Sequence, residues 1–463
     1  MDILSDSLEI NIKALKNNVT SGKTTDIRWR ILQINKISTL INENKNQIIK
    51  SLKIDLGKSK IEALSEILLI QEEILLVKKN LRLWMRPKPI NAPIYLFPAS
   101  SKIIYEPLGC VLIIGPYNYP FLYIFKPLVN IFSAGNTAVL KPSEKCPETS
   151  ELISKLTQKY FTKDILSTVE GGLKTSKNLI KEDFDHIFFT GSTETGKSIM
   201  KSASKNLTPL TLELSGTNPV IIFKNANLKI AAKRIVWGKF FNSGQSCVAP
   251  NHIFVEKEIE NKLIEEIINC IYEFYGRDPI KSENLSKLEK GQFKTTLKLL
   301  KRFKKSKLII HGGIYDKKEF KISPTIIKCK SENEKIINKE MFSSLLPVVP
   351  INNIENTVNI IQKTNKPLVI YIFGGTKNNH RFISKVTSSG SICINDVILP
   401  VLIPNLSFGG VGKSGMGRFH GEEGFKNFSN SKSYIEKNTF LDVNLRYPPY
   451  EKILNLINYI FKI

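Results

Sequence analysis

The sequence of 463 residues has few of the residues that build disulfide frameworks or metal centres. Its six cysteines form no Cys-x-x-Cys pair and show no metal-ligand spacing, and its five histidines do not complete a zinc set. We therefore expect a reduced, cytoplasmic protein without a bound metal. Such a chain must fold around a hydrophobic core, which its hydrophobic fraction of 42% can supply.

Long apolar runs are also absent. No run reaches roughly 18 residues, the length that indicates a membrane-spanning helix. The N-terminus begins Met1-Asp2-Ile3-Leu4-Ser5-Asp6 and lacks the basic segment and apolar core of a signal peptide. The C-terminal segment 446–463 is amphipathic and flanked by lysines, so we expect at most a peripheral membrane contact there.

Acidic residues are scarce relative to basic ones, since 42 Asp and Glu against 67 Lys and Arg give a net charge of +25. Such a charge suits nucleic acid, an anionic membrane or an anionic substrate. The lysines are spread along the chain, however, and the densest cluster, 301–307, is typical of a solvated helix face. We expect no nucleic-acid partner. An inactive basic scaffold that binds nucleic acid remains an alternative.

The order of apolar segments predicts an α/β fold. Long helices are expected over 7–85, and a proline-rich excursion follows over 86–107. Strands followed by glycine or polar turns are expected at 110–115, 137–141, 165–169 and 186–190. Their carboxyl ends should meet at one ligand-binding crevice. A second alternation over 218–394 predicts a second α/β domain, which the glycine-rich stretch 408–421 is expected to close.

The segment Gly191-Ser192-Thr193-Glu194-Thr195-Gly196-Lys197-Ser198 matches the pattern of an ATP-binding P-loop. An ATPase of that kind also needs an acidic metal holder at the end of another apolar strand, and no convincing strand ending in Asp is present. A glycine turn that opens a helix still offers free backbone N–H groups to an anion. The segment therefore predicts phosphate binding, either by ATP or by a dinucleotide.

Three residues suggest covalent chemistry on a carbonyl. Cys247 follows small and polar residues, so we expect the backbone around its thiol to be exposed. Backbone N–H groups there would lower the pKa of the thiol and would later stabilise an oxyanion. Glu213 lies between Leu212 and Leu214 in a strand, and a desolvated carboxylate there would act as a general base. Asn118, between two prolines, offers a fixed amide donor. The alternatives are a structural cysteine, a surface glutamate and a turn asparagine.

Together these segments resemble the aldehyde dehydrogenase superfamily over nearly the whole chain, most closely its class 3 type. The matching stretches are 107–120, 134–144, 189–196, 212–214, 237–247, 340–342, 407–417 and 446–449. The resemblance implies that Cys247 attacks an aldehyde and that the Asn118 side chain and the Cys247 N–H stabilise the resulting oxyanion. Hydride then passes to a nicotinamide, and water activated by Glu213 hydrolyses the thioester.

The resemblance also implies the cofactor NAD, with NADP possible. Lys141 and Glu144 would hold the adenosine ribose, Ser192 the pyrophosphate, and Gly191 and Gly196 the turn beneath it. Glu340, with Phe342 beside it, matches the cofactor-ribose glutamate and in class 3 enzymes can share the proton transfer. A carboxylate at Glu144 favours free ribose hydroxyls, whereas the Lys141 charge would tolerate a 2′-phosphate.

The resemblance further divides the chain into domains. A Rossmann-like dinucleotide-binding domain would comprise 1–82 and 103–211, and an α/β catalytic domain 212–405. A small β bridging element, 83–102 and 406–445, would form a homodimer, and 446–463 would be a tail. The expected substrate is a medium- or long-chain aliphatic or an aromatic aldehyde, in an apolar tunnel lined by Tyr119, Phe121, Tyr123 and Phe240.

Some positions depart from the family pattern. Ser215 replaces the usual glycine, Thr217 a common lysine, and Ser343-Ser344 the usual Gly-Pro. We expect Ser215 to crowd the base and the two adjacent serines to loosen a loop near the nicotinamide, with effects on rate and cofactor preference rather than on reaction type.

Overall fold

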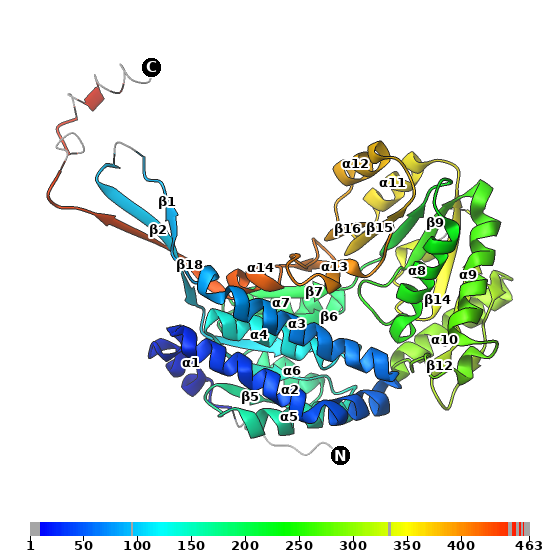
Figure 1. Ribbon diagram of the computed structural model, residues 1–463, viewed down its shortest axis with the longest axis horizontal. Helices are drawn as coiled ribbons and strands as arrows, with labels where there is room; N and C mark the ends of the chain where they lie inside the picture. Colours follow the sequence, from blue (N-terminus) through cyan, green and yellow to red (C-terminus); the bar gives the residue numbers. More distant parts are fainter. Residues whose placement is uncertain are drawn as a thin grey trace.

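The computed structural model describes residues 10–93, 96–331, 335–442, 447–450, 453–454 and 457. Two large sheets with helices packed against them lie side by side, and a small three-stranded sheet projects from one of them as an arm (Figure 1). The predicted α/β fold is confirmed. Most of the predicted tail, 446–463, lies outside the described residues. Within the described ranges, no helix is both long enough and apolar enough to cross a bilayer.

The chain begins with the expected helices, α1 (Ile12–Thr20), α2 (Ile27–Leu56) and α3 (Lys60–Trp84). Local signals set their limits. Asp26 caps α2, Gly57 ends it in a left-handed conformation at φ 62°, and Ser59 with Glu62 forms a capping box at the start of α3. Helix α2 packs against α3, α4 and α5, so the buried faces of these helices cover the first large sheet.

The first large sheet has six strands in the order β17-β7-β6-β3-β4-β5. Five of them are parallel and β17 is antiparallel. The strands are β3 (Cys110–Ile114), β4 (Thr137–Lys141), β5 (Leu166–Thr168), β6 (His186–Gly191), β7 (Leu210–Leu214) and β17 (Gly415–Met416), and the helices between them are α4 (Leu122–Ala134), α5 (Pro147–Tyr160), α6 (Leu173–Leu179) and α7 (Thr193–Ala203). The four predicted strands are confirmed. Because the winding direction reverses between β3 and β6, a ligand crevice is expected at their carboxyl ends.

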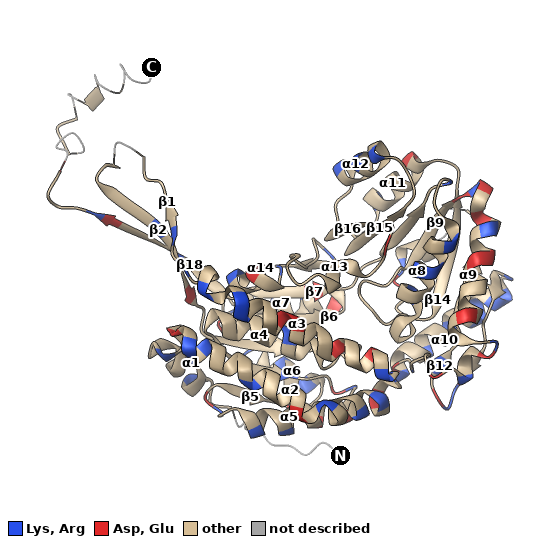
Figure 2. Cartoon of the chain, viewed as in Figure 1, with Lys and Arg blue, Asp and Glu red and all other residues tan. Residues whose placement is uncertain are grey.

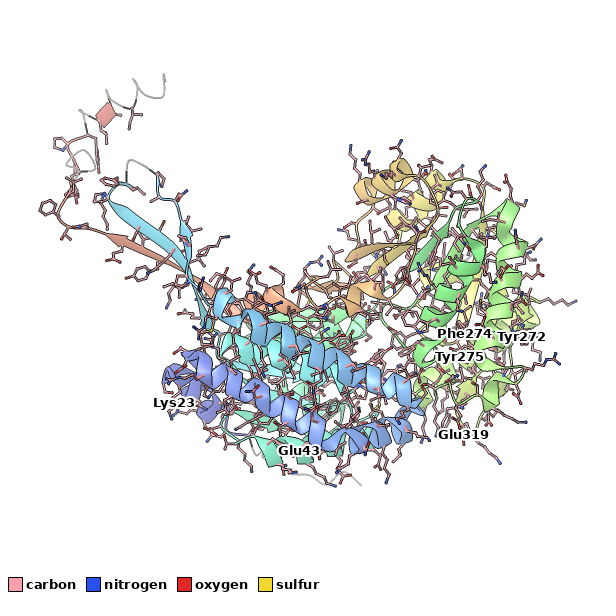
Figure 3. All side chains as sticks on the ribbon, viewed as in Figure 1. Lys23, Glu43, Tyr272, Phe274, Tyr275 and Glu319 are labelled. Atoms are coloured by element: carbon pink, nitrogen blue, oxygen red, sulfur yellow. The ribbon has the colours of Figure 1, made fainter. Side chains whose placement is uncertain are left out.

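The second large sheet has seven strands in the order β10-β13-β14-β9-β8-β15-β16, with only β10 antiparallel. They are β8 (Pro219–Ile222), β9 (His252–Glu256), β10 (Ile309–His311), β13 (Thr325–Lys328), β14 (Leu345–Ile351), β15 (Val369–Phe373) and β16 (Ser391–Ile394), with helices α8 (Leu228–Phe240), α9 (Glu260–Tyr275), α10 (Lys290–Lys305), α11 (Ile354–Lys363) and α12 (Lys377–Val386). Tyr275, labelled at the lower end of α9 in Figure 3, packs edge-on against Phe240 of α8. The alternation of strands and helices predicted over 218–394 is thus present, and it forms a sheet of its own.

The arm consists of β1 (Lys88–Ile90), β2 (Ala99–Pro107) and β18 (Ser429–Lys437). All three are antiparallel, and β18 pairs along the whole of β2 (Figure 1). Apolar side chains on it face outward, including Ile435 at 71% exposed. The short helices α13 (Leu399–Leu402) and α14 (Gly421–Asn427) precede β18 in the sequence.

The sheets do not follow the predicted domain boundaries at every point. The boundary between 211 and 212 falls inside β7, and the segment 406–445 contributes β17 to the six-stranded sheet as well as β18 to the arm. Hydrogen bonding between strands therefore joins residues that the predicted domain boundaries separate.

The two large sheets are joined end to end. Strand β7 ends at Leu214 and β8 begins at Pro219, so the carboxyl edge of the first sheet lies close to the amino edge of the second. The loops at these two edges therefore face one another.

Charged residues are spread over both large units rather than collected on one face. Figure 2 shows Lys and Arg on helices of both large units, with Asp and Glu beside them on α2 and α9, whereas α10 and α12 carry basic residues without acidic ones. This distribution gives the basic charge no single stripe of the kind that tracks a nucleic-acid backbone.

The glycine-rich stretch 408–421 was expected to close the second domain; Ser414 Oγ bonds to the Pro367 carbonyl before β15, but the stretch also adds a strand to the first sheet. Its strand β17 pairs with β7, which places Gly415 opposite Glu213 on the first sheet. The glycines allow the backbone to double back on itself: a Cβ on Gly410 would lie 2.0 Å from the Ser414 carbonyl oxygen.

We predict that Gly410→Ala lowers the free energy of unfolding by about 1–3 kcal/mol, because backbone atoms cannot move aside as a side chain can. Urea unfolding curves measure this loss. Gly172→Ala is the matched control, since a Cβ there would meet no atom within 4 Å. Equal stability of the two variants would contradict the packing argument.

Candidate active site

A cavity of about 640 Å³ lies where the loops of the two sheets face one another. Its size suits a small-molecule or cofactor site. The cavity is lined by every predicted site residue except Gly196, namely Asn118, Lys141, Glu144, Gly191, Ser192, Glu213, Cys247, Glu340 and Phe342. Gly196 lies behind the turn, where a Cβ would come within 2.7 Å of Leu214.

Cys247 is presented by an unusual turn between α8 and β9. Asn242, Ser243 and Gly244 have left-handed φ values of 51°, 53° and 78°. A Cβ on Gly244 would lie 2.3 Å from the Ser343 carbonyl oxygen, so this glycine permits a close approach of two loops. The Asn218 side chain donates to the Cys247 carbonyl at 2.6 Å and thereby fixes the far side of the cysteine.

The Cys247 thiol is partly exposed to the cavity. Removal from water raises its pKa to about 12, the Tyr123 hydroxyl lowers it, and the charges of Glu213 and Glu340 raise it. Tyr123 Oη lies 3.6 Å from Cys247 Sγ. The pKa of Tyr123 is raised well above its ordinary value, again by burial, so the phenol keeps its proton and donates when the sulfur ionises.

Asn118 is buried and lies beside the cysteine segment, as the sequence suggested. Its side-chain Nδ2 donates to the Gln245 carbonyl at 2.9 Å. Its own carbonyl accepts from Lys58 Nζ and from Asn242 Nδ2, both at 2.8 Å. An amide nitrogen carries two hydrogens, so the bond to Gln245 leaves one donor and fixes the plane in which it lies.

Glu213 is also buried, with 3% of its surface exposed. Neither carboxylate oxygen has a hydrogen-bond partner within the part of the chain that the structure describes. Burial therefore raises the pKa of Glu213 well above its ordinary value, and only the charge of Arg418 opposes this. The alternation of β7 placed this side chain correctly, away from Leu212 and Leu214.

Glu340 approaches the cavity from the loop before β14. Burial raises its pKa to about 7, while hydrogen bonds from the Ser215 hydroxyl and the Gly216 N–H and the charge of Lys239 lower it. Ser215 was expected to crowd Glu213. Its hydroxyl instead lies close enough to Glu340 to lower the pKa of that carboxyl, an effect that the usual glycine cannot have.

Lys141 and Glu144 lie together at the end of β4. Lys141 is 1% exposed, and its Nζ contacts the Pro142 carbonyl at 2.7 Å and Glu144 Oε2 at 3.3 Å. Burial lowers the pKa of Lys141, and the charge of Glu144 opposes that shift. Because the Glu144 carboxylate is about half exposed, it can accept bonds from hydroxyl groups in the cavity.

The turn from β6 into α7 has the form of an anion site. Ser192 caps α7, and its Oγ accepts from the Thr195 N–H at 3.2 Å. A Cβ on Gly191 would lie 2.4 Å from the Phe189 ring, so the turn must be glycine. Free N–H groups and the helix dipole at this end favour a phosphate.

The P-loop alternative fails on its lysine. Lys197 Nζ bonds to Glu194 at 2.7 Å on the exposed face of α7, and Lys197 is not among the residues that line the cavity. A P-loop lysine must reach the β- and γ-phosphates. The short pattern matched because lysine and serine are common in this sequence.

None of the four aromatic residues predicted to line an apolar tunnel lines this cavity. Phe121 packs against Phe125 at 4.5 Å between ring centres, and Phe240 packs against Tyr275, both inside the hydrophobic core. Tyr119 and Tyr123 lie near the thiol, and the hydrogen bond from Tyr123 was not foreseen. The sequence did contain a signal for this hydrogen bond: Tyr123 lies in the apolar first turn of a helix, and a buried tyrosine hydroxyl needs a hydrogen-bond partner.

Ser343 and Ser344 do not loosen their loop. Both are fully buried, and Ser344 Oγ donates to the Ser243 carbonyl at 3.2 Å. The two serines therefore pack against the turn that carries Cys247.

We predict that Tyr123→Phe slows alkylation of Cys247 by iodoacetamide at pH 8 by about tenfold, because a hydrogen bond to a charged group is worth about 1.5–3 kcal/mol. The pH dependence of the alkylation rate reports the thiol pKa. It should shift upward in the variant. Tyr105→Phe, on β2, is the matched control, and an unchanged rate in Tyr123→Phe would show that the hydroxyl does not stabilise the thiolate.

The comparisons with known proteins agree with this geometry. The family model described as "Aldehyde dehydrogenase family" matches residues 5–434. The chain is 38% identical to the 4,4′-diaponeurosporen-aldehyde dehydrogenase of Staphylococcus aureus, over 95% of this chain and 96% of that one. It is 36% identical to the dimeric NADP-preferring aldehyde dehydrogenase of Rattus norvegicus, over 96% of this chain and 98% of that protein.

A solved structure gives the same result. The substrate-bound state of Staphylococcus aureus AldH has a TM-score of 0.93 and 36% identity, and the match covers 97% of this chain and 98% of that one. These findings favour neither the ATP-binding nor the nucleic-acid-binding alternative. The chain therefore belongs to the aldehyde dehydrogenase family, and it is an oxidoreductase that oxidises aldehydes with NAD(P).

Proposed function

We propose that the chain oxidises its aldehyde through a thioester on Cys247. The observation that carries this proposal is the convergence of a thiol, an amide donor and a desolvated carboxylate, Cys247, Asn118 and Glu213, on one cavity. The anion-binding turn at Gly191 opens into the same cavity, so substrate and dinucleotide can meet there.

The first step is attack of the Cys247 sulfur on the aldehyde carbon. Tyr123 supports the thiolate, and the carbonyl oxygen takes up the negative charge. The second Asn118 amide hydrogen and the Cys247 N–H then stabilise this oxyanion. Hydrogen-bond donors that the protein already holds in place stabilise the oxyanion without having to reorient during the reaction. Such stabilisation is a large contribution to catalysis.

Glu213 is the proposed base for hydrolysis of the thioester. A carboxylate without partners, in a low-dielectric site, binds a proton more readily than one in water, so it can take the proton of an attacking water molecule. Glu340, whose pKa lies at about 7, is placed to share this proton transfer. Splitting oxidation from hydrolysis replaces one difficult step with two easier ones.

The residues around the β3 and β6 ends fit a nicotinamide dinucleotide. Glu144 would accept from ribose hydroxyls, Lys141 would lie beside them, and Ser192 with the N-terminus of α7 would hold the pyrophosphate. Gly196 would keep the turn close to the sheet, and Glu340 and Phe342 would hold the second ribose. When bound, the cofactor supplies the hydride acceptor.

The substrate is proposed to be a medium- or long-chain aliphatic or an aromatic aldehyde. Apolar groups in and near the cavity, among them Phe342, Met341 and Tyr117, support an apolar substrate. The relative in Staphylococcus aureus carries a diaponeurosporen-aldehyde in its name.

We further propose a homodimer formed through the arm, in the cytoplasm. The outward-facing apolar side chains of β18 support this, as does the relative named as dimeric. We also propose the division into a dinucleotide-binding domain, a catalytic domain and a bridging element, with one main sheet in each, although β7 and β17 cross the boundaries given above.

Cys247→Ala should abolish aldehyde-dependent reduction of NAD and NADP while leaving cofactor binding unchanged, because the cavity keeps its cofactor side. Absorbance of the reduced nicotinamide measures turnover, and calorimetric titration measures binding. Cys270→Ala, which removes a thiol on α9 outside the cavity, should remain active. Turnover by Cys247→Ala would refute the covalent route.

Glu144→Gln should raise the ratio of kcat/KM for NADP to that for NAD by about tenfold, because removing one negative charge near a 2′-phosphate is worth about 1.4 kcal/mol. Lys141 would then attract the phosphate unopposed. Glu148→Gln is the control, since Glu148 is exposed on the first turn of α5 and does not line the cavity. An equal ratio in both variants would place the ribose elsewhere.

A further inference from the structure

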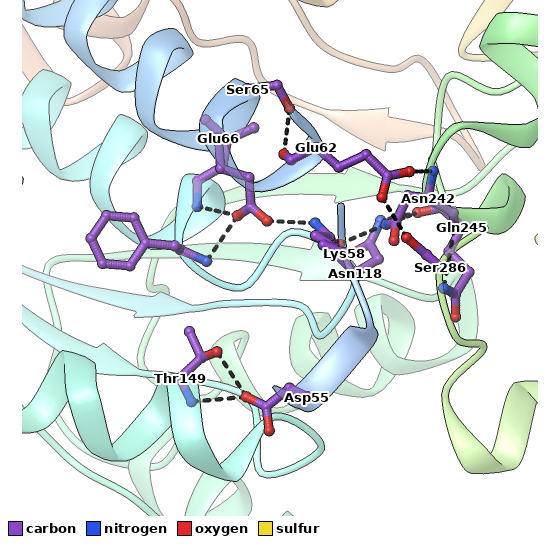
Figure 4. Close-up of polar contacts among 12 residues, drawn as sticks. Asp55, Lys58, Glu62, Ser65, Glu66, Asn118, Thr149, Asn242, Gln245 and Ser286 are labelled. Atoms are coloured by element: carbon purple, nitrogen blue, oxygen red, sulfur yellow. Dashed lines mark hydrogen bonds and ion pairs between the residues drawn. The ribbon is translucent and has the colours of Figure 1, made fainter. Parts of the chain in front are cut away.

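Three charged side chains at the start of α3 are buried beside the proposed oxyanion site (Figure 4). Lys58 and Glu66 have no exposed side-chain surface and form an ion pair at 2.5 Å. Glu62 is 2% exposed. Burying charges is costly, and well-packed apolar residues commonly give equal stability, so such a cluster needs a further explanation.

Glu62 holds the turn that leads to Cys247. Its Oε1 accepts from the Asn242 N–H at 2.7 Å, and its Oε2 accepts from Ser286 Oγ at 2.6 Å. Because Asn242 is in the left-handed region, a strong bond to its N–H helps to maintain a conformation that side chains other than glycine seldom adopt. The capping box explains only the bond that Glu62 Oε2 accepts from the Ser59 N–H, and it does not explain the bonds to Asn242 and Ser286.

Lys58 and Glu66 hold the loop that carries Asn118. Lys58 Nζ donates to the Asn118 carbonyl at 2.8 Å and lies 4.1 Å from the centre of the Tyr119 ring. Glu66 Oε2 accepts from the N–H groups of Phe121 and Leu122 at 3.1 Å and 2.9 Å. The loop is thereby bonded at Asn118 and again three and four residues after it, as Figure 4 shows.

The two halves of the cluster meet at the site itself. Asn242 Nδ2 donates to the Asn118 carbonyl, and Asn118 Nδ2 donates to the Gln245 carbonyl. The segment from Lys58 to Glu66, at the N-terminus of α3, therefore bonds to both loops. One loop carries the proposed amide donor on the first sheet, and the other carries the proposed nucleophile on the second.

We propose that Lys58, Glu62 and Glu66 are positioning residues that set the Asn118 amide against the Cys247 sulfur. None of them lines the cavity, so they act through Asn118 and the Asn242 turn. This inference rests on the proposed roles of Asn118 and Cys247. Misplacing a reacting group by about 1 Å can cost a hundredfold in rate.

The test is a double-mutant cycle between the cluster and Asn118. The variant Lys58→Met/Glu66→Gln removes the buried pair together, so that no unpaired charge remains. It should lower kcat/KM for the aldehyde by about 10–100-fold. The dissociation constant for NAD and the rate of Cys247 alkylation should stay within about twofold, because neither depends on the Asn118 amide.

In an Asn118→Ala background the same double substitution should have almost no further effect, since the residue through which the cluster acts is gone. A purely structural role predicts the opposite, with losses that multiply and a lower melting temperature as the main change. Multiplying losses would therefore overturn the proposal. Glu62→Gln, which keeps the side-chain shape, repeats the cycle independently if the paired variant does not fold.

Lys60→Met is the matched control, because Lys60 is the exposed neighbour in the same turn and should retain full kcat/KM. The outcome also separates this proposal from the proposed function. If Cys247→Ala is inactive and the paired variant keeps normal kcat/KM, the positioning role alone is wrong. If Cys247→Ala is active, the covalent route is wrong.

Discussion

The end-to-end joint between the two large sheets is the constraint on which the site depends. Only residues 215–218 separate the last residue of β7 from the first residue of β8. This short link brings the carboxyl edge of one sheet against the amino edge of the other, where loops from both must share a space. Ligand sites form at the carboxyl edge of such sheets, and here the facing edge adds the thiol. The joint thus creates the cavity and buries the groups around it.

Burial has opposite consequences for two sets of charged residues. For Glu213 and Cys247 removal from water outweighs the opposing effects of the Arg418 charge and the Tyr123 hydroxyl, so both pKa values are raised. Lys58 and Glu66 are paired and accept or donate several further bonds, and that pairing makes them suited to fixing geometry. The proposed site thus combines poorly solvated groups with a neighbouring buried ion pair whose charges are both hydrogen-bonded.

Departures from the family pattern also lie around this site. The Ser215 hydroxyl lowers the pKa of Glu340, and Ser344 Oγ bonds to the carbonyl of Ser243 in the cysteine turn. Ser343 lies against Gly244, where only a glycine permits so close an approach. Ser344 therefore adds a polar contact where its loop meets the cysteine turn, whereas the Ser343 hydroxyl has no hydrogen-bond partner among the described residues.

The sequence by itself determined the elements and the identity of the chemistry. Strands such as Cys110–Ile114 are continuous apolar runs because helices cover both faces of the sheet, and the capping pair Ser59 and Glu62 marks a helix start. Only the tertiary structure decided that 408–421 joins the first sheet, that Phe121 and Phe240 are core, and that Lys197 faces outward. It alone brought Glu62 to Asn242 and Lys58 to Asn118, because local periodicity carries no information about partners 180 and 60 residues away.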